Sequence, residues 1–235
     1  MSKSTSKLSK KLPLRKRILL IVLVVIIALV SVVAVAYSRY IYPTGKIMPD
    51  IYAVRSDRNG MPMGNFFLVQ NGEKYIAIDA GADNVQAENG LRKLGISAGD
   101  VEAVFITHSH WDHVGSLDLF DNAVIYSGNT EGSDFPDIPH LIMTDGEIVM
   151  FGDVSVQCLY TPGHTKDSVC FLVDGKYLFV GDLFITTNDS PFEARYDKDL
   201  QLAYREEMLS LDGVEYVFTG HFGLFKDVRF YRWWY

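Results

Sequence analysis

The fold of this chain is indicated most strongly by one short stretch, Thr107-His108-Ser109-His110-Trp111-Asp112-His113. The stretch follows an apolar run that is typical of a buried strand. Imidazoles and carboxylates are the ligands that zinc and similar divalent ions take in proteins. Ligand-type side chains packed this densely are costly to bury without partners. The stretch therefore predicts a metal-binding loop at the end of a strand.

Three later segments repeat the same residue types in the same kind of place. They are Thr161-Pro162-Gly163-His164, Gly181-Asp182 and Thr219-Gly220-His221. A single core histidine is usually a hydrogen-bonded structural residue. Five of the six histidines of the chain, each in a segment rich in Gly, Thr or Ser at a predicted strand end, are poorly explained in that way. The sixth, His140, lies in a Pro-flanked loop, and we assign it no role.

The order H-x-H-x-D-H, then His, Asp and His, resembles that of the metallo-β-lactamase superfamily. The resemblance covers residues 65–221, most of the chain after its N-terminal apolar segment. It implies a mixed α/β (α+β) fold, an αββα sandwich with a dinuclear metal site along one edge. The chain is expected to hold two Zn²⁺ ions there, with iron or manganese as the alternatives.

The resemblance also implies a ligand for each position of the site. The first metal would be held by His108, His110 and His164. The second metal would be held by Asp112, His113 and His221. Asp182 would bridge the two ions. Asp79 matches an aspartate beside the site and is expected to orient a ligand histidine; the alternative is a turn carboxylate that caps the loop of Gly81.

A dinuclear site of this kind predicts hydrolytic chemistry. Two divalent ions about 3.5–4 Å apart share a water and lower its pKa towards neutrality, so a metal-bridging hydroxide is the expected nucleophile. No serine or cysteine nucleophile is needed. Asp112 is a candidate catalytic residue as well as a ligand, because it is placed to orient the hydroxide and take up its proton.

Asp182 narrows the expected substrate class. An aspartate at the bridging position resembles the glyoxalase II and lactonase branches of the superfamily, whereas true zinc β-lactamases generally have other residues there. Glyoxalase II carries a further helical domain and the nuclease branch carries an inserted one, whereas only 14 residues follow His221 here. We therefore expect a minimal hydrolase domain that acts on a small ester, thioester, lactone or related compound.

Two other function classes compete with this interpretation. One is a mononuclear iron dioxygenase of sulfur compounds on the same fold, whose ligands overlap the predicted set; the di-iron redox type usually has an acidic residue where His110 stands. The other is a non-catalytic binding protein. A missing ligand would favour the last class, and no ligand is missing.

Residues 18–36 predict a transmembrane signal-anchor. The segment is 19 residues long, with Ser31 its one clearly polar side chain, so as a helix it spans ~28 Å. Seven Lys and Arg residues precede it and none of the 29 acidic residues does, which predicts a cytoplasmic N-terminus and an exported domain. Cleavage as a signal peptide after Ala34-Val35-Ala36 is the alternative.

The predicted organisation is a basic cytoplasmic segment (1–17), the membrane segment (18–36), a linker (37–48) and the hydrolase domain (49–235). Beyond residue 36 the chain holds 15 basic and 29 acidic residues, which makes nucleic acid an unlikely partner. The expected partners are a small-molecule substrate and the lipid bilayer.

Hydrophobic periodicity predicts the remaining elements. Strands are expected at 51–55, 65–69, 74–79, 101–107, 123–127, 147–150, 154–160, 169–173, 177–180 and 214–219. Helices are expected at 85–94, 114–120 and 200–211, the last with an apolar face of Leu200, Leu202, Ala203, Met208 and Leu211. The loops 60–64 and 186–192 are candidate pocket walls, and the aromatic tail 230–235 is expected to pack over a sheet edge. Cys158 and Cys170 are expected in the core, with a disulfide as the alternative.

Overall fold

The computed structural model describes residues 13–40, 43–58, 61–184, 195–221 and 224–226. The chain divides into two compact units, residues 1–39 and 40–235. The expected loop at 186–192 and the tail at 230–235 lie outside the described residues.

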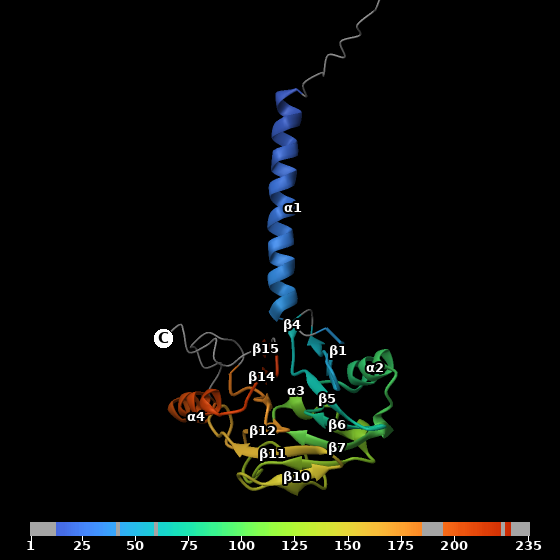
Figure 1. Cartoon of the computed structure of the whole chain (residues 1–235), viewed down its shortest axis with the longest axis vertical. Helices are drawn as coiled ribbons and strands as arrows, with labels where there is room; N and C mark the ends of the chain where they lie inside the picture. The colour runs from blue at the N-terminus through green and yellow to red at the C-terminus, as the bar shows by residue number, and fades with distance from the viewer. Residues whose placement is uncertain (1–12, 41–42, 59–60, 185–194, 222–223, 227–235) are drawn as a thin grey trace, which may run out of the picture. The chain divides into compact units, whose positions relative to one another are not determined.

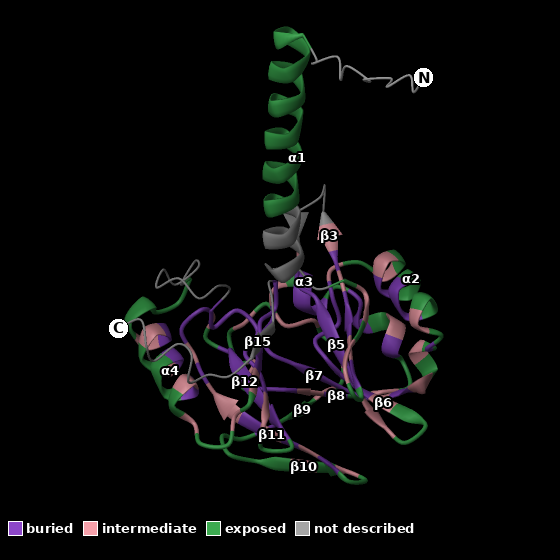
Figure 2. Cartoon of the chain, turned by 45° about the horizontal axis from the view of Figure 1, so that its top comes forward, coloured by how far each residue is buried: buried purple, intermediate pink, exposed green. Residues whose placement is uncertain are grey.

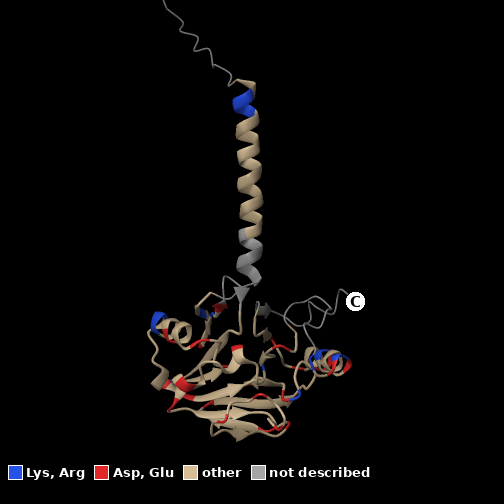
Figure 3. Cartoon of the chain, turned by 180° about the vertical axis from the view of Figure 1, so that it is seen from behind, with Lys and Arg blue, Asp and Glu red and all other residues tan. Residues whose placement is uncertain are grey.

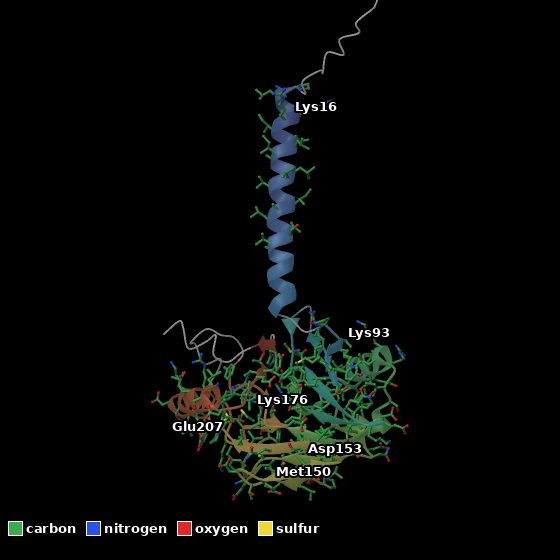
Figure 4. All side chains as sticks on the ribbon, in the orientation of Figure 1. Lys16, Lys93, Met150, Asp153, Lys176 and Glu207 are labelled. Carbon is green, nitrogen blue, oxygen red and sulfur yellow. The ribbon has the colours of Figure 1, made fainter. Side chains whose placement is uncertain are left out.

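The first unit contains one long helix, α1 (Leu14–Tyr40). Its part Leu14–Val33 is exposed throughout and is long and apolar enough to cross a membrane, by length and composition alone. Its side chains project on all sides of the helix (Figure 4). Between Leu14 and Val33, Lys and Arg occur only in the first turn (Figure 3). The Ser31 hydroxyl donates to the Ile27 carbonyl (2.8 Å), so the one polar side chain of the apolar segment is satisfied within the helix.

The second unit is built on two main sheets (Figure 1). The first contains, in spatial order, β1 (Gly45–Met48), β2 (Ile51–Val54), β5 (Phe66–Asn71), β6 (Lys74–Ile78), β7 (Val101–Ile106), β8 (Val124–Ser127) and β9 (Leu141–Ile142). The second contains β10 (Ile148–Phe151), β11 (Val154–Tyr160), β12 (Val169–Val173), β13 (Tyr177–Phe179), β14 (Tyr216–Phe218) and β15 (Leu224–Lys226). A short ribbon joins β3 (Asp57–Arg58) to β4 (Met61–Pro62) within the expected loop region.

The second unit has four layers, a helix layer on the outside of each of the two sheets, and one hydrophobic cluster lies between each pair of neighbouring layers. Buried residues fill the inside of this unit in Figure 2. The central cluster lies between the sheets and includes Phe67, Phe105 and Phe171. The outer face of the first sheet packs against α2 (Asn84–Leu94), and that of the second against α4 (Lys198–Ser210). The αββα sandwich expected from the sequence is confirmed.

The region after β7 differs from expectation. Instead of a helix at 114–120, the chain forms α3 (Trp111–Val114) and a separate 3₁₀ turn, η2 (Leu117–Phe120). The amides of His113 and Val114 both bond the His110 carbonyl, so the helix starts inside the histidine motif. It ends at Gly115, whose Cα packs against the carbonyl groups of Ala82 and Trp111. Gly45–Met48, expected to belong to a linker, forms β1 and pairs with β2.

The buried face of α4 was predicted only in part, since Met208 is buried and Leu211 packs against the same cluster, as expected. Its buried residues are Gln201, Arg205 and Met208, whereas Ala203 is exposed and Leu202 only half-buried. Glu207 projects from the outer face, as Figure 4 shows. Apolar periodicity failed here because Gln201 is buried to make hydrogen bonds rather than apolar contacts.

The two cysteines are free thiols in the core. They lie on neighbouring strands but on opposite faces of the second sheet, Cys158 towards the central cluster and Cys170 towards α4. The expectation of buried core residues is confirmed, and the alternative of a disulfide is wrong. Burial raises the pKa of both thiols to about 12.

We therefore predict that neither thiol of the native, detergent-solubilised chain reacts with a disulfide reagent such as DTNB at pH 8. Only the thiolate reacts, and a pKa of about 12 leaves almost none of it. In denaturant both thiols should react without any reductant. A thiol that titrates in the native state, or one that needs reduction before it reacts, would contradict this placement.

Candidate metal centre

The predicted ligands follow strand ends that meet at one edge of the sandwich. β6 and β7 are parallel neighbours, and Asp79 and the histidine motif follow their carboxyl ends. In the second sheet β13 and β14 are also parallel, and Asp182 and His221 follow them. His164 follows β11, which runs in the same direction as β13 because each is antiparallel to β12.

The seven predicted ligands come together in two groups. The first consists of His108, His110, His164 and Asp182, and the second of Asp112, His113 and His221. Within each group one ligand atom per residue lies within 4.8 Å of all the others. All seven residues are buried except His110, which is half-buried.

The Asp182 carboxylate lies between the groups. Its Oδ2 is 3.5 Å from His164 Nε2 and 3.2 Å from His221 Nε2. Its Oδ1 is 3.4 Å from His113 Nε2. One carboxylate thus faces ligand atoms of both groups, as a bridging ligand must.

Unsatisfied atoms show that the residues fit divalent cations. His113 Nε2 and Asp182 Oδ1 are buried without a hydrogen-bond partner among the described residues. The Nε2 atoms of His108 and His164 both lie 3.0 Å from His110 Nδ1, so three ring nitrogens converge on one point. A buried polar atom without a partner costs about 1–3 kcal/mol. A cation at each group would satisfy these lone pairs together.

Two imidazoles of the first group, those of His108 and His110, favour the neutral form that metal ligation needs. Burial, followed by the neighbouring His113, lowers the pKa of His108 well below its usual value. Burial also lowers the pKa of His110 to about 4, with further contributions from His164 and the Arg195 guanidinium.

In the second group, the pKa values of the two histidines are raised rather than lowered while no cation is bound. Burial works against the imidazolium of His113, but the carboxylates of Asp79 and Asp182 raise its pKa well above the usual value. Asp182 raises the pKa of His221 similarly. Burial alone would raise the pKa of Asp182, but His221 and His113 hold it well below the usual range. Metal binding to this group must therefore displace protons.

Asp79 orients His113. Its Oδ2 lies 2.8 Å from His113 Nδ1, which turns Nε2 of the same ring towards Asp182. Its carboxylate also accepts from the backbone N–H (2.8 Å) and the hydroxyl (3.0 Å) of Thr107. Asp79 has a φ of 63°, a left-handed conformation that costs energy in most non-glycine residues. These contacts support the orienting role over the capping of the Gly81 loop.

Close backbone approach shapes the other side of the site. A Cβ atom on Gly220 would lie 2.7 Å from both Asp182 Oδ1 and His113 Cε1. Only glycine allows the His221 loop to come this near to the carboxylate.

Two residues of the site were not found from the sequence. The fully buried Asn65 donates from its amide to the His221 carbonyl (3.2 Å) and accepts from the Ser56 N–H. The amide of Gln201 bonds the backbone carbonyl of Asp182 (3.2 Å). Neither belongs to a spacing pattern, because each bonds the backbone of a segment remote in sequence.

The other candidate residues lie outside the two ligand groups. Phe184 is buried in the cluster beneath α4, which indicates core packing. His140 bonds Thr130 and the Ile138 carbonyl and packs on Phe135. Met63 is half-buried, and its contact with a substrate stays a prediction.

Replacement of Asp79 by Asn tests its orienting role. Asn tolerates the left-handed backbone but removes the negative charge that holds His113. We expect Asp79→Asn to weaken Zn²⁺ binding by about 10–100-fold, measured by competition with a chromophoric chelator.

Asp174→Asn is the matched control, since Asp174 also has a positive φ (51°) but lies in a hairpin turn away from the site. Equal Zn²⁺ affinity in the two variants would show that Asp79 does not orient a ligand.

Comparison with known proteins places this geometry in a family. The model of the metallo-β-lactamase superfamily matches residues 60–221. A probable hydroxyacylglutathione hydrolase of Schizosaccharomyces pombe is 29% identical over 170 residues, which cover 69% of this chain and 64% of that protein. The chain thus spans less than two thirds of that relative.

Two further proteins are similar to this chain, one by its sequence and one by its solved structure. The acyl-coenzyme A thioesterase MBLAC2 of Gallus gallus is 24% identical, with 72% of this chain and 76% of that protein covered. A metallo-β-lactamase family protein of Thermus thermophilus has a TM-score of 0.63 at 20% identity, covering 78% of this chain and 77% of that one. The likeness of that structure concerns the fold. With the family model matching most of the chain, this protein belongs to the metallo-β-lactamase superfamily.

Proposed function

We propose that the chain is a dinuclear metal-dependent hydrolase, with two Zn²⁺ ions as its cofactors and a thioester or related small ester as its substrate. The observation that carries the proposal is the pair of ligand groups that share Asp182. A mononuclear site has no use for the second group, in which Asp112, His113 and His221 converge in a buried position. This favours the dinuclear hydrolase over the mononuclear iron dioxygenase.

The proposal assigns each of the seven ligand residues to one or both metals. His108, His110 and His164 hold the first metal, Asp112, His113 and His221 the second, and Asp182 both. When bound, two such ions lower the pKa of a shared water and polarise the substrate carbonyl. The Gly64 N–H donates to Asp112 Oδ2 (3.1 Å), which orients this carboxylate, and in the proposal Asp112 would accept the proton of the water.

Thioesters are the first substrates to test. Two similar proteins are named as a hydroxyacylglutathione hydrolase and an acyl-coenzyme A thioesterase. In such a hydrolysis the oxygen of water bonds to the acyl carbon, the carbon–sulfur bond breaks, and the thiol leaves with a proton. The exposed Arg195 is near enough to lower the pKa of His110, so an anionic substrate group would meet a cation beside this residue.

Metal analysis and one substitution test the proposal together. We expect the purified chain to contain about two zinc ions, and His110→Ala to lose thioester hydrolysis by at least ~10³-fold while its circular dichroism is unchanged, because the residue lies in a loop at a strand end. His140→Ala is the matched control and should keep wild-type turnover.

Full activity of His110→Ala after chelation and zinc re-addition would overturn the assignment of the site. A content of one iron ion per chain, with oxygen consumed in the presence of thiols, would replace the hydrolase with the dioxygenase.

We further propose that α1 anchors the chain in a membrane, with the N-terminus in the cytoplasm and the metal centre outside. The exposed apolar residues 18–33 and the seven Lys and Arg residues before them support this orientation. Because a signal sequence has the same properties, retention of α1 is part of the proposal.

Labelling of intact cells tests the topology. Both native cysteines are buried, so a cysteine placed at the exposed Lys93 of α2 serves as a reporter (Figure 4). We expect Lys93→Cys to react with a membrane-impermeant maleimide in intact cells and to remain with the membranes after an alkaline wash.

Ser6→Cys, in the basic segment, should react only after permeabilisation. The reverse pattern would refute the orientation, and release of the labelled chain into the medium would show that the segment is a cleaved signal.

A further inference from the structure

The segment from Arg195 to Gln201 packs against two of the three loops that carry ligands of the first metal group, those of His164 and Asp182. The Arg195 N–H donates to the carbonyl of the predicted ligand His164 (3.1 Å). The Asp197 N–H donates to the Gly163 carbonyl (2.9 Å). The segment then enters α4, where Asp197 caps the helix by accepting the Leu200 N–H (2.9 Å).

Gln201, in the first turn of α4, reaches the second loop. Its amide nitrogen donates to the carbonyl of Asp182 (3.2 Å) and to that of Leu183 (2.9 Å). Both acceptors are carbonyl oxygens, so only the nitrogen can face them. The amide oxygen is buried without a hydrogen-bond partner among the described residues, a cost that an apolar side chain would avoid.

The backbone of Gln201 also touches the first loop. A Cβ atom on Gly163 would lie 2.5 Å from Gln201 Cα and 2.6 Å from Gln201 N. Gly163 therefore lies against the helix backbone with no room for a side chain between them. Through one residue, the position of His164 on one loop is tied to that of Asp182 on the other.

We infer that Gln201 is a positioning residue that fixes the distance between His164 and Asp182 before any metal binds. Donor atoms must be held to within about 0.5 Å of the productive geometry for tight binding. The buried amide holds two backbone carbonyls of the Asp182 loop, and leucine at the same place would leave both without this donor. The inference rests on the metal-binding part of the proposed function and is independent of the substrate.

The test measures metal affinity without turnover. In the full chain in detergent, Gln201→Leu keeps the side-chain volume but removes the donors. We expect its Zn²⁺ affinity, measured by chelator competition, to fall by about 10–100-fold. With Co²⁺ in place of zinc, the visible absorption spectrum should change, since the ligand positions are no longer fixed.

Gln86→Leu is the matched control. Gln86 also joins a helix to a remote backbone, since its amide donates to the Asp57 carbonyl and accepts the Asp57 N–H, both at 2.8 Å. Asp57 is not a predicted ligand. The control should lose thermal stability in the metal-free state to a similar degree, yet keep its Zn²⁺ affinity and Co²⁺ spectrum.

A second variant keeps the inference falsifiable if Gln201→Leu does not fold. Gln201→Glu has the same shape but offers no amide donor, and its metal affinity should also fall. If a folded Gln201 variant binds Zn²⁺ as tightly as wild type, with an unchanged Co²⁺ spectrum, the inference is wrong while the metal centre stands. If wild type itself binds no divalent metal, the metal centre fails as well.

Discussion

A buried carboxylate among imidazoles is the constraint on which the rest of this structure depends. Asp182 is 4% exposed, and three histidine nitrogens lie within 3.5 Å of its oxygens. Removing such a charge from water is costly unless opposite charge and hydrogen-bonding partners are supplied. Without metal, Asp182 raises the pKa values of the neighbouring His113 and His221, which favours the imidazolium form of both. When metal binds as proposed, two cations would take over this role beside the Asp182 carboxylate. The surrounding fold is the framework that holds the carboxylate and the histidines together.

The framework works through strand direction. Parallel pairing of β6 with β7, and of β13 with β14, brings four chain segments to the same edge. Each ligand therefore lies on a short loop directly after its strand, and close backbone contacts bring the loops together. Gly220 lets one loop approach the carboxylate, and Gly163 lets a helix approach another. At these two positions beside the ligands, the close contacts require glycine.

The sequence predicted the parts of the structure that have local patterns. Alternating and continuous apolar runs located most strands, and the spacing of five histidines located the site. It failed where remote contacts decide the outcome. Gln201 reads as a polar surface position of an amphipathic helix, but it is fully buried because its partners lie in another loop. In place of the expected helix at 114–120, α3 ends at Gly115, where the Ala82 carbonyl leaves no room for a side chain. Two-residue strands such as β9 are too short to show any period.

The division of the ligands between the two sheets has a consequence for folding. The histidine motif follows a strand of the first sheet, whereas His164, Asp182 and His221 follow strands of the second. The two groups therefore form only when the sheets have docked, and a bound ion acts as a cross-link between the halves of the sandwich. Ions that bind only the folded state shift the folding equilibrium by mass action, in proportion to the logarithm of their free concentration. If the two groups hold ions as proposed, the free energy of unfolding of this domain would depend on the free metal concentration around it as well as on its hydrophobic core.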